Sequence, residues 1–464
     1  MSPKFGTSGL RGLATELTPE LVTDYVRAFL AACPVGGGVH VGRDLRDSSP
    51  AIAGAVIDAL RGAGVRATDC GVLPTPALAL AAMDAGEGAV MVTGSHIPAD
   101  RNGLKFYVPS GEIAKTDETA ITAALGAGAP DAAHAPLAED PGAIDRYRDR
   151  YAAAFGPEAL HGLRVGVYQH SSVARDVMVE VVEALGGTAV ALARSDSFVP
   201  VDTEALEPEM RAMLAGWCSE HGLDAVISTD GDADRPMLAD ATGRVVPGDV
   251  LGALTARALG AKILCTPVSA NSMITEMPDF SAIKRTRIGS PFVIAAMEEV
   301  LSADPAAPVV GYEPNGGFLL GFAAEGPAGP LAPLMTRDCL LPILAPLAAA
   351  REAGGIAALV ADLPPRFTAA DRIKDVPSDA STAFLAALAE DSGRRAEIFD
   401  AGSPESAIDL TDGLRVSFGS GEVVHLRASG NAPEARVYAE AATAERAEAL
   451  VARHIAALAA ALKG

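Results

Sequence analysis

The chain has 464 residues, which corresponds to about three domains at roughly 150 residues each. It carries 37 Lys and Arg residues against 59 Asp and Glu residues, a formal net charge of −22 at pH 7. This charge argues against a nucleic-acid-binding protein and against docking on an anionic membrane surface. It also repels anions at long range, so an anionic ligand requires a local basic site.

The apolar and sulfur-containing residues restrict the cellular setting. No apolar segment reaches the roughly 18 residues that a membrane helix needs; the closest, Cys339–Ala350, contains Pro342 and Pro346. The N-terminal residues have no apolar core of a signal peptide. The 5 cysteines show no zinc-ligand or CxxC spacing, and a sparse, odd number fits reduced thiols. We therefore expect a cytoplasmic protein.

The first part of the chain alternates helices and strands. Helices are predicted over 18–33, 49–63 and 75–84, each opened by a Thr-Pro or Ser-Pro pair, and strands over 39–41 and 89–93. Such alternation indicates βαβ units with helices on both faces of a sheet. Residues 123–142 are rich in Ala, Gly, Pro and Asp and are predicted to be a loop or linker.

Similar alternation resumes twice and then stops. The predicted strands are 163–168, 225–229, 263–268 and 309–312, and the predicted helices are 174–185, 291–301 and about 336–353. The double proline at 364–365 ends this part. Beyond it, paired strands are predicted over 414–418, 422–426 and 435–440, with a hairpin turn at 419–421 and a final helix capped by Thr443. The pattern predicts an α/β protein with three similar mixed α/β domains and a smaller C-terminal α+β domain.

A weak internal repeat accompanies this organisation. The strands 89–93 and 225–229 each run into a polar loop that contains Gly and the tripeptide Ala-Asp-Arg, and the strand at 309–312 runs into a third Gly-rich loop. Ligands bind beyond the carboxyl ends of strands in open α/β sheets. The three loops are therefore expected to face one cleft, although similar α/β units can also converge on similar loops.

The first loop, residues 93–105, combines Ser95, His96 and Lys105. A serine beside a histidine, with a lysine close by, suggests a nucleophile with acid–base groups. The alternative is a surface turn, since Ser, Pro, Asn and Gly favour turns. The GxSxG spacing of a hydrolase nucleophile elbow is absent.

The second loop places Asp230, Asp232 and Asp234 directly after an apolar strand. Three carboxylates this close repel one another unless a cation or solvent lies between them, and hard oxygen ligands suit Mg²⁺ or Ca²⁺. An EF-hand is excluded because its sixth and twelfth positions are Arg235 and Ala241. Magnesium is favoured over a solvated acidic turn.

Two later loops contain polar groups for a sugar phosphate. Glu313 and Asn315 can hydrogen-bond sugar hydroxyls. The segment 427–436 contains two arginines, a serine and a Gly-Asn turn, which can encircle a phosphate. Each loop, taken alone, is also compatible with an ordinary turn. No Walker A or GxGxxG motif supports nucleotide binding.

Taken in this order, the loops strongly resemble those of the α-D-phosphohexomutase family. FGTSGLRG at 5–12 matches the family's opening motif, and VGRDLR at 41–46 matches an early strand and loop. TGSHIP with its NGLK tail resembles the family's active-site serine loop, and DGDADR resembles its magnesium loop. The similarity extends from residue 5 to residue 436.

The resemblance implies four domains around a central cleft. Domain I with the phosphoserine loop is expected over 1–155, and domain II with the metal loop over 156–250. Domain III with the sugar loop is expected over 251–366, and domain IV with the phosphate loop over 367–464.

The resemblance also implies a role for each matching residue. Ser95 would carry the phosphoryl group and would hold Mg²⁺ together with Asp230, Asp232 and Asp234. Arg11, His96, Lys105 and Arg235 would surround the transferring group, with Lys105 or His96 moving a proton. Glu313 and Asn315 would recognise the sugar. The second phosphate would be bound by Arg427, Ser429, Asn431 and Arg436.

The implied activity is the interconversion of hexose 6-phosphate and hexose 1-phosphate through a phosphoserine and a hexose 1,6-bisphosphate, which also acts as activator. Mannose is the expected sugar; glucose, glucosamine and a non-catalytic sugar-phosphate-binding homologue are the alternatives. The expected partner is a small-molecule sugar phosphate, with no nucleic acid or membrane, for a monomer or homodimer.

Three loops depart from the family's pattern. Ile97 stands where Asn is common, and the sugar loop has Asn315 in place of Ser. Gly317 replaces the histidine that ends that motif, and Asn431 replaces Thr in the phosphate loop. Substrate preference is the property that these changes affect most directly.

Overall fold

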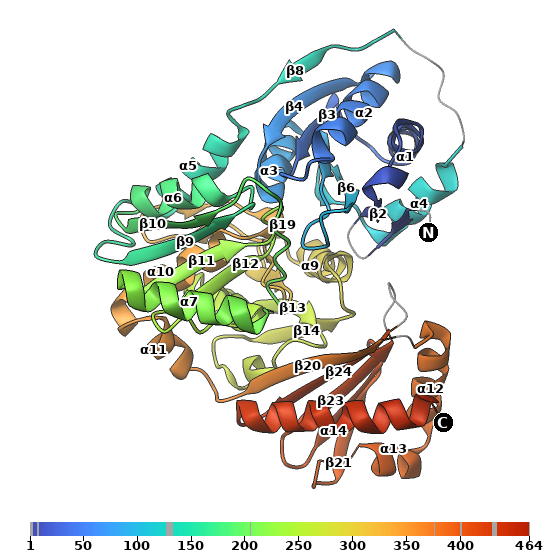
Figure 1. The fold of residues 1–464 in the computed structure, drawn as a ribbon, viewed down its shortest axis with the longest axis vertical. Coiled ribbons are helices and arrows are strands. Elements are labelled where there is room, and N and C mark those ends of the chain that lie inside the picture. The colour runs from blue at the N-terminus through green and yellow to red at the C-terminus, as the bar shows by residue number, and fades with distance from the viewer. Residues whose placement is uncertain are drawn as a thin grey trace.

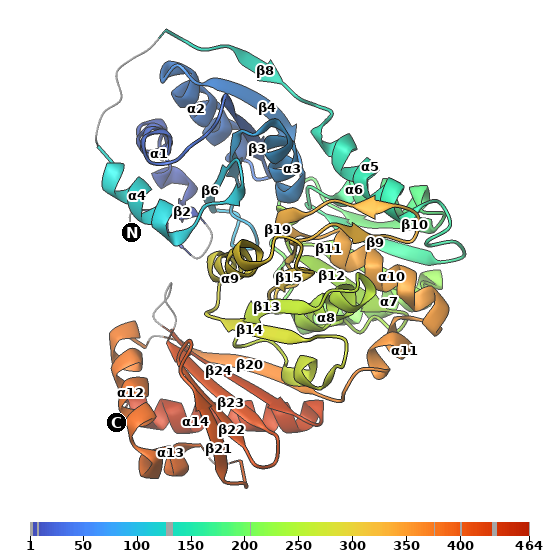
Figure 2. The ribbon, with the colours of Figure 1, turned by 180° about the vertical axis from the view of Figure 1, so that it is seen from behind.

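The computed structural model of the chain describes residues 3–6, 9–126, 133–204, 206–374, 376–399, 401–428 and 434–463. Four main sheets follow one another along the chain, the first three covered by helices (Figures 1 and 2). This confirms the predicted mixed α/β units with a smaller α+β unit at the C-terminus. None of the helices in the described ranges combines the length and apolar character that a bilayer crossing requires.

The first sheet has the strand order β1-β2-β6-β5-β3-β4-β8, with β7 beside β6. Its strands are β1 (Lys4–Phe5), β2 (Leu10–Leu13), β3 (Gly38–Arg43), β4 (Arg66–Val72), β5 (Gly88–Val92), β6 (Arg101–Val108), β7 (Gly111–Glu112) and β8 (Leu137–Glu139). Its helices are α1 (Pro19–Ala32), α2 (Ser49–Gly62), α3 (Thr75–Ala85), α4 (Lys115–Ala124) and α5 (Ala143–Phe155). The Thr18 side chain caps α1 as expected, by accepting from the amide of Leu21.

The second sheet has the order β10-β9-β11-β12. It contains β9 (Arg164–His170), β10 (Thr188–Arg194), β11 (Ala225–Thr229) and β12 (Pro236–Asp240), with α6 (Arg175–Ala184) and α7 (Pro208–His221).

The third sheet has the order β14-β13-β15-β16-β19. It contains β13 (Ile263–Pro267), β14 (Ala282–Thr286), β15 (Val309–Tyr312), β16 (Phe318–Leu320) and β19 (Leu334–Asp338); β17 (Ala324–Glu325) and β18 (Pro330–Leu331) form a separate pair. The accompanying helices are α8 (Gly248–Ala258), α9 (Ser290–Ala303), α10 (Leu341–Ala353) and α11 (Ile356–Ala361).

The same four-strand arrangement recurs in all three sheets. Three parallel strands are followed by one antiparallel strand in β4-β3-β5-β6, in β10-β9-β11-β12 and in β14-β13-β15-β16. In each case the polar loop of the weak sequence repeat joins the third strand to the fourth. The three loops therefore occupy equivalent places, each at the carboxyl end of a central strand.

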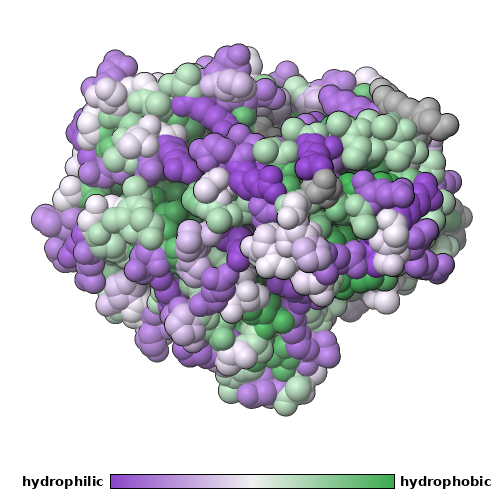
Figure 3. Space-filling model, turned by 90° about the horizontal axis from the view of Figure 1, so that it is seen from below, coloured by the Kyte–Doolittle hydropathy of each residue, from purple (hydrophilic) through white to green (hydrophobic). Residues whose placement is uncertain are grey.

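The fourth sheet is antiparallel throughout, in the order β20-β24-β23-β22-β21. Its strands are β20 (Phe367–Lys374), β21 (Glu405–Asp409), β22 (Leu414–Phe418), β23 (Val423–Ala428) and β24 (Glu434–Ala441), and its helices are α12 (Ser378–Glu390), α13 (Ser392–Ile398) and α14 (Ala444–Lys463). The predicted hairpin turn and the Thr443 cap of α14 are both present. Hydrophilic side chains cover much of this end of the molecule, between small apolar patches (Figure 3).

The apolar cores show how the units are connected. The largest core joins α3 and α5 to the second and third sheets, so these parts share one interior. The C-terminal sheet has a core of its own, formed between Ile373 and Leu458. This unit makes polar contacts with segments that adjoin the third sheet. Glu440 accepts a hydrogen bond from the amide of Ser272 at 3.0 Å, and Asp412 accepts one from the amide of Ile288 at 3.0 Å. Polar interfaces of this kind permit relative domain motion.

Two secondary-structure predictions were wrong. The supposed linker 123–142 contains β8, which extends the first sheet by pairing with β4. The helix expected from about residue 336 begins only at Leu341, because residues 334–338 form β19 beside β16. In both cases pairing with a distant strand decides the structure, and no local pattern reports that pairing.

Candidate active site

Arg46 binds the backbone of the serine loop that follows β5 at several points. Arg46 donates from its guanidinium to the backbone carbonyls of Ser95 at 2.9 Å and Ile97 at 2.6 Å. It also reaches the carbonyls of Pro98 and Arg101. A Cβ at Gly94 would lie 2.4 Å from the Arg46 guanidinium carbon, so only glycine fits there. Arg46 binds the backbone of this loop and not its side chains. The loop can therefore accommodate Ile97 at a position where the family commonly has the polar residue Asn.

The charge of Arg46 is balanced inside the protein. Its Nε donates to Asp44 at 3.1 Å, and both side chains are fully buried. The ring of Phe198, which lies beyond the second sheet's β10, stacks 3.9 Å from the guanidinium. Asp44 also accepts from Thr93 Oγ1, whose oxygen in turn accepts from the amide of Ser95. This network fixes Ser95 in the left-handed region (φ 54°), a strained conformation typical of functional sites.

The metal loop that follows β11 meets the serine loop directly. Ser95 Oγ donates to Asp230 Oδ2 at 2.6 Å. The N-terminus of α3 docks on the same loop, where Thr75 Oγ1 donates to Asp232 at 2.6 Å. Asp230, Asp232 and Asp234 are all buried, although isolated carboxylates almost never are. The structure therefore brings the predicted nucleophile and the predicted metal ligands into one site.

Several cations face these carboxylates. Lys105 Nζ on β6 contacts Asp232 at 2.6 Å and Asp234 at 2.5 Å. Arg235 lies 4.0 Å from Asp234, and Arg11 on β2 donates to the carbonyl of Thr93 at 2.8 Å. These three cations thus lie at the loops that contain the serine and the aspartates.

The electrostatics of the site are those of a crowded, buried cluster. Burial, together with the charges of Asp232 and Asp234, raises the pKa of Asp230 well above its usual range. Burial acts in the same direction on Asp234, but Arg337 and Lys105 bring its pKa below the usual value. Burial and the nearby cations Arg235 and Arg11 lower the pKa of His96 to about 2, so its imidazole is neutral. His96 Nδ1 lies 3.3 Å from Ser95 Oγ.

The three aspartates have the chemistry of a divalent-cation site. One oxygen from each of the three carboxylates can bind the same ion, because these oxygens lie within 4.8 Å of one another. Asp232 Oδ1 and Asp234 Oδ1 are buried and have no hydrogen-bond partner among the residues that the structure describes. Unpartnered buried carboxylate oxygens carry a free-energy penalty that a bound cation removes. The residues present therefore fit Mg²⁺, which prefers such hard oxygen ligands.

The sugar loop that follows β15 forms a tight turn. The amide of Glu313 donates to the carbonyl of Gly317, and the Asn315 side chain accepts from the amide of Gly317 at 2.9 Å. Glu313 and Asn315 are both buried, and their side chains lie 3.5 Å apart. Burial raises the pKa of Glu313, opposed by Arg337 and Arg235.

Arg337 is a site residue that the sequence analysis missed. It projects from β19 and ion-pairs with Asp234 of the metal loop at 2.9 Å and with Glu112 of β7 at 3.2 Å. The segment was expected to be helical, and Arg337 belongs to no recognisable motif. Arg46 lay inside a recognised motif but had no role assigned to it.

The predicted phosphate-binding arginines lie on the fourth sheet. Arg427 on β23 and Arg436 on β24 are cross-strand partners. In the structure Arg427 donates to Asp412 at 3.0 Å, and Arg436 donates to Glu434 at 2.8 Å. Ser429 and Asn431 lie outside the described residues.

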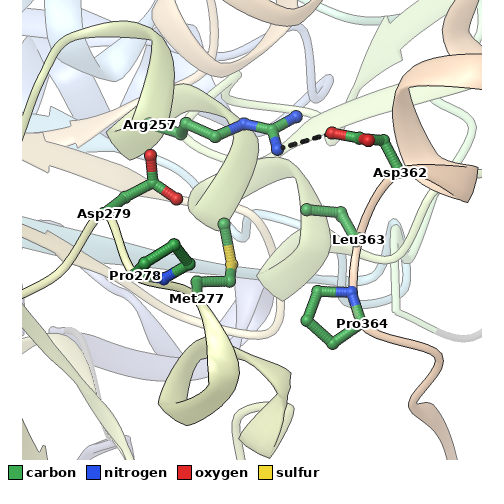
Figure 4. A pocket seen from close by; sticks show the side chains of 7 residues that line it. All are labelled: Arg257, Met277, Pro278, Asp279, Asp362, Leu363 and Pro364. Carbon is green, nitrogen blue, oxygen red and sulfur yellow. Dashed lines mark hydrogen bonds and ion pairs between the residues drawn. The ribbon is translucent and has the colours of Figure 1, made fainter.

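A separate hollow of about 390 Å³ lies where the chain passes to the fourth sheet (Figure 4). Arg257 of α8, residues 277–279 and residues 362–364 line it, and Arg257 pairs with Asp362 at 3.1 Å. None of the predicted site residues lines this hollow, so it is not the candidate active site.

Comparison with known proteins identifies the family. The model of "Phosphoglucomutase/phosphomannomutase, alpha/beta/alpha domain I" matches residues 2–130, that of domain II matches 145–243, and that of the C-terminal domain matches 367–457. The chain belongs to this family. The match confirms the resemblance seen in the loop motifs and makes the chain a phosphohexomutase by family.

Full-length relatives of this phosphohexomutase agree. A phosphomannomutase of Sinorhizobium fredii is 45% identical over 474 residues, which cover 99% of each chain. A phosphomannomutase of Salmonella muenchen is 41% identical and covers 95% of this chain and 92% of its own. The fold matches a solved family member from Burkholderia thailandensis with a TM-score of 0.79 at 22% identity, covering 99% of this chain and 98% of the other.

Proposed function

We propose that this phosphohexomutase is a phosphomannomutase, which interconverts mannose 6-phosphate and mannose 1-phosphate. The observation that carries the sugar assignment is the full-length similarity to two phosphomannomutases at 45% and 41% identity. The contact between Ser95 Oγ and the carboxylate cluster supports the chemistry, because a hydroxyl beside three carboxylates suits phosphoryl transfer assisted by a divalent cation.

In the proposed reaction Ser95 carries a phosphoryl group. Ser95 transfers it to the free hydroxyl of the bound sugar monophosphate, which yields the 1,6-bisphosphate. After reorientation of this intermediate, Ser95 takes back the other phosphoryl group. Arg11, Lys105 and Arg235 neutralise charge on the transferring oxygens, and most of the rate enhancement comes from positioning and electrostatics.

Proton movement falls to the two groups beside the serine. His96 Nδ1 is 3.3 Å from Ser95 Oγ, which is within reach of the serine proton. Lys105 lies among the aspartates and can donate to, or accept from, the sugar hydroxyl. We propose His96 and Lys105 as the proton-transfer groups.

Asp230, Asp232 and Asp234 would hold Mg²⁺ together with an oxygen on Ser95. The ion supplies positive charge beside the transferring phosphoryl group. The unpartnered oxygens of Asp232 and Asp234 support this assignment.

Substrate recognition is divided between two sheets. Glu313 and Asn315 are proposed to hydrogen-bond the sugar hydroxyls, since both are polar and buried at the carboxyl end of β15. Arg427 and Arg436, with Ser429 and Asn431 of the intervening loop, are proposed to bind the phosphate that is not transferred.

We propose the four-domain division 1–155, 156–250, 251–366 and 367–464. The first boundary follows α5 and the last precedes β20. Helix α8 spans the second boundary, so limited proteolysis is expected to cut in the loop before Gly248 rather than inside the helix.

A coupled assay tests the sugar assignment. Mannose 1-phosphate and glucose 1-phosphate are supplied separately with Mg²⁺ and the matching 1,6-bisphosphate. The expected result is a higher kcat/KM for mannose 1-phosphate. A higher value for glucose 1-phosphate would assign phosphoglucomutase activity instead, and no turnover of either would reject both the mannose and the glucose assignment. Turnover of glucosamine 1-phosphate, with none of the other two substrates, would assign phosphoglucosamine mutase activity.

A non-catalytic homologue is the second candidate, favoured by Gly317 and Ile97 at positions where the family has other residues. Intact-mass analysis separates the two. A species heavier by one phosphoryl group that maps to Ser95 supports the enzyme, and sugar-phosphate binding without that species or turnover supports the binding protein.

A further inference from the structure

Arg337 stands where three polypeptide segments meet. Its side chain is 2% exposed. Nη2 lies 2.9 Å from Asp234 of the metal loop, Nε donates to Glu112 of β7 at 3.2 Å, and Nη1 lies 4.0 Å from Glu313 of the sugar loop. One guanidinium thus connects carboxylates that belong to the first, second and third sheets.

Gly317 of the sugar loop makes room for this arginine. A Cβ at position 317 would lie 2.9 Å from both Cγ and Cδ of Arg337 and 3.2 Å from its Cβ. Gly317 is not among the glycines with a left-handed backbone, so the backbone itself accepts alanine. The need for glycine at 317 therefore comes from the Arg337 side chain.

We propose that Arg337 is a positioning residue that couples the sugar loop to the metal loop. The inference rests on the proposed function, in which Asp234 holds the metal and Glu313 binds the sugar. The segments with which Arg337 pairs come from separate parts of the chain, and two buried carboxylates repel each other unless a cation lies between them. Arg337 supplies that cation through Asp234 Oδ2, while Asp234 Oδ1 accepts no hydrogen bond from the described part of the chain.

The guanidinium suits this task better than an ammonium group. Its planar fork has separate nitrogens for separate carboxylates and stays charged when buried. In this chain Gly317 occupies the place of the family's sugar-loop histidine, and the Arg337 stem fills the adjacent space. The positive group beside Glu313 therefore comes from β19 instead of the sugar loop.

Arg337→Gln and Arg337→Lys test the proposal through Mn²⁺ binding, measured by electron paramagnetic resonance on the full chain without sugar. Loss of a positive charge alone would tighten cation binding. Loss of a partner that orients a metal ligand weakens it, by about 10- to 100-fold in known sites. We expect Arg337→Gln to weaken Mn²⁺ binding by that factor and to raise KM for mannose 1-phosphate, with Arg337→Lys between it and the wild type.

Arg395→Gln is the matched control. Arg395 is also buried and ion-paired, to Glu405 at 2.8 Å, but it lies in the C-terminal unit. This variant is expected to keep wild-type Mn²⁺ affinity and KM. A similar loss in Arg395→Gln would mean that any buried arginine disturbs the site, and it would overturn the proposal.

Gly317→Ala provides a second route that keeps Arg337 in the chain. The added methyl group is expected to displace the arginine and to weaken Mn²⁺ binding as Arg337→Gln does. The double variant is then expected to show no additional loss, since both changes break one arrangement. Full additivity, or Mn²⁺ affinity in Arg337→Gln that is unchanged or tighter, would overturn the proposal.

Two readouts keep this test separate from the proposed function. Absence of turnover in the wild type would reject the function and leave the Mn²⁺ comparison intact. If Arg337→Gln does not fold, Gly317→Ala and Arg337→Lys decide the outcome on the same measurement.

Discussion

Ser95 Oγ donates a hydrogen bond to Asp230 Oδ2 across 2.6 Å, and this contact joins the loop after β5 to the loop after β11. The two residues are 135 positions apart in the chain. They meet because the first and second sheets repeat one strand arrangement and present the same connection at their carboxyl ends. The proposed nucleophile and the proposed metal site therefore meet at the junction between two units, and neither unit contains both.

Ser95→Ala is expected to lower kcat by at least about 1,000-fold, because it removes the hydroxyl that is proposed to carry the phosphoryl group. Intact-mass spectrometry should lose the phosphorylated species at the same time. The thermal unfolding temperature should change little, since the loop is held through its backbone by Arg46. Activity near the wild-type value would mean that Ser95 is not the nucleophile.

Removal of divalent cations with EDTA is expected to abolish turnover and to lower the unfolding temperature. A cation at 100 times its Kd stabilises the folded state by about 2.7 kcal/mol. Asp232→Asn should reduce both the Mg²⁺-dependent activity and the Mg²⁺-induced rise in unfolding temperature. Asp279→Asn, which changes a carboxylate outside the cluster, serves as control. An equal Mg²⁺ response in Asp232→Asn and wild type would contradict the metal assignment.

Arg46→Met is expected to destabilise the protein by about 3–5 kcal/mol, because it leaves the buried charge of Asp44 unpaired. In the protein that remains folded, kcat should fall about 100-fold, the cost of a nucleophile misplaced by about 1 Å. Denaturant unfolding and steady-state kinetics measure the two effects. Unchanged kcat in the folded fraction would show that Ser95 does not depend on Arg46 for its position.

Arg436→Ala is expected to raise KM for the sugar phosphate at least 10-fold, since one charge-assisted hydrogen bond to phosphate contributes about 1.5–3 kcal/mol. Phosphorylation of Ser95 by the 1,6-bisphosphate should also need a higher bisphosphate concentration. Arg446→Ala is the control in the same sheet unit, where Arg446 pairs with Glu422. Equal KM values for the two variants would remove Arg436 from the phosphate site.

Asp249 gives the stability a defined pH dependence. Burial raises the pKa of Asp249 to about 6, although its oxygens accept from the amides of Asn271 and Val250. The folded protein therefore keeps a proton that the unfolded chain has lost, and this stabilising contribution disappears as the pH rises from about 4 to about 6.

The free energy of unfolding of the wild type should fall by about 2 kcal/mol between pH 4.5 and pH 6.5 relative to that of Asp249→Asn, at about 1.4 kcal/mol per pH unit. Urea unfolding of both proteins at the two pH values measures this difference. If the wild type loses no stability relative to the variant over this pH range, the pKa of Asp249 is not raised.

The sequence by itself determined the class of fold and predicted most residues of the candidate site. Helix caps such as Thr18 act through local hydrogen bonds, and apolar runs such as residues 225–229 become buried strands, so both can be read from neighbouring residues. The residue types and the spacing of the aspartates and Ser95 indicate their chemistry. They lie in loops whose form depends on a few nearby residues.

Only the tertiary structure decided how those loops meet and which residues outside the motifs support them. The strand β19 forms because β16 lies beside it, and that pairing turns Arg337 toward Asp234. Arg46 acts through carbonyl groups about 50 residues further along the chain. Contacts between distant residues depend on strand order and packing, and these are properties of the whole chain that no local pattern encodes.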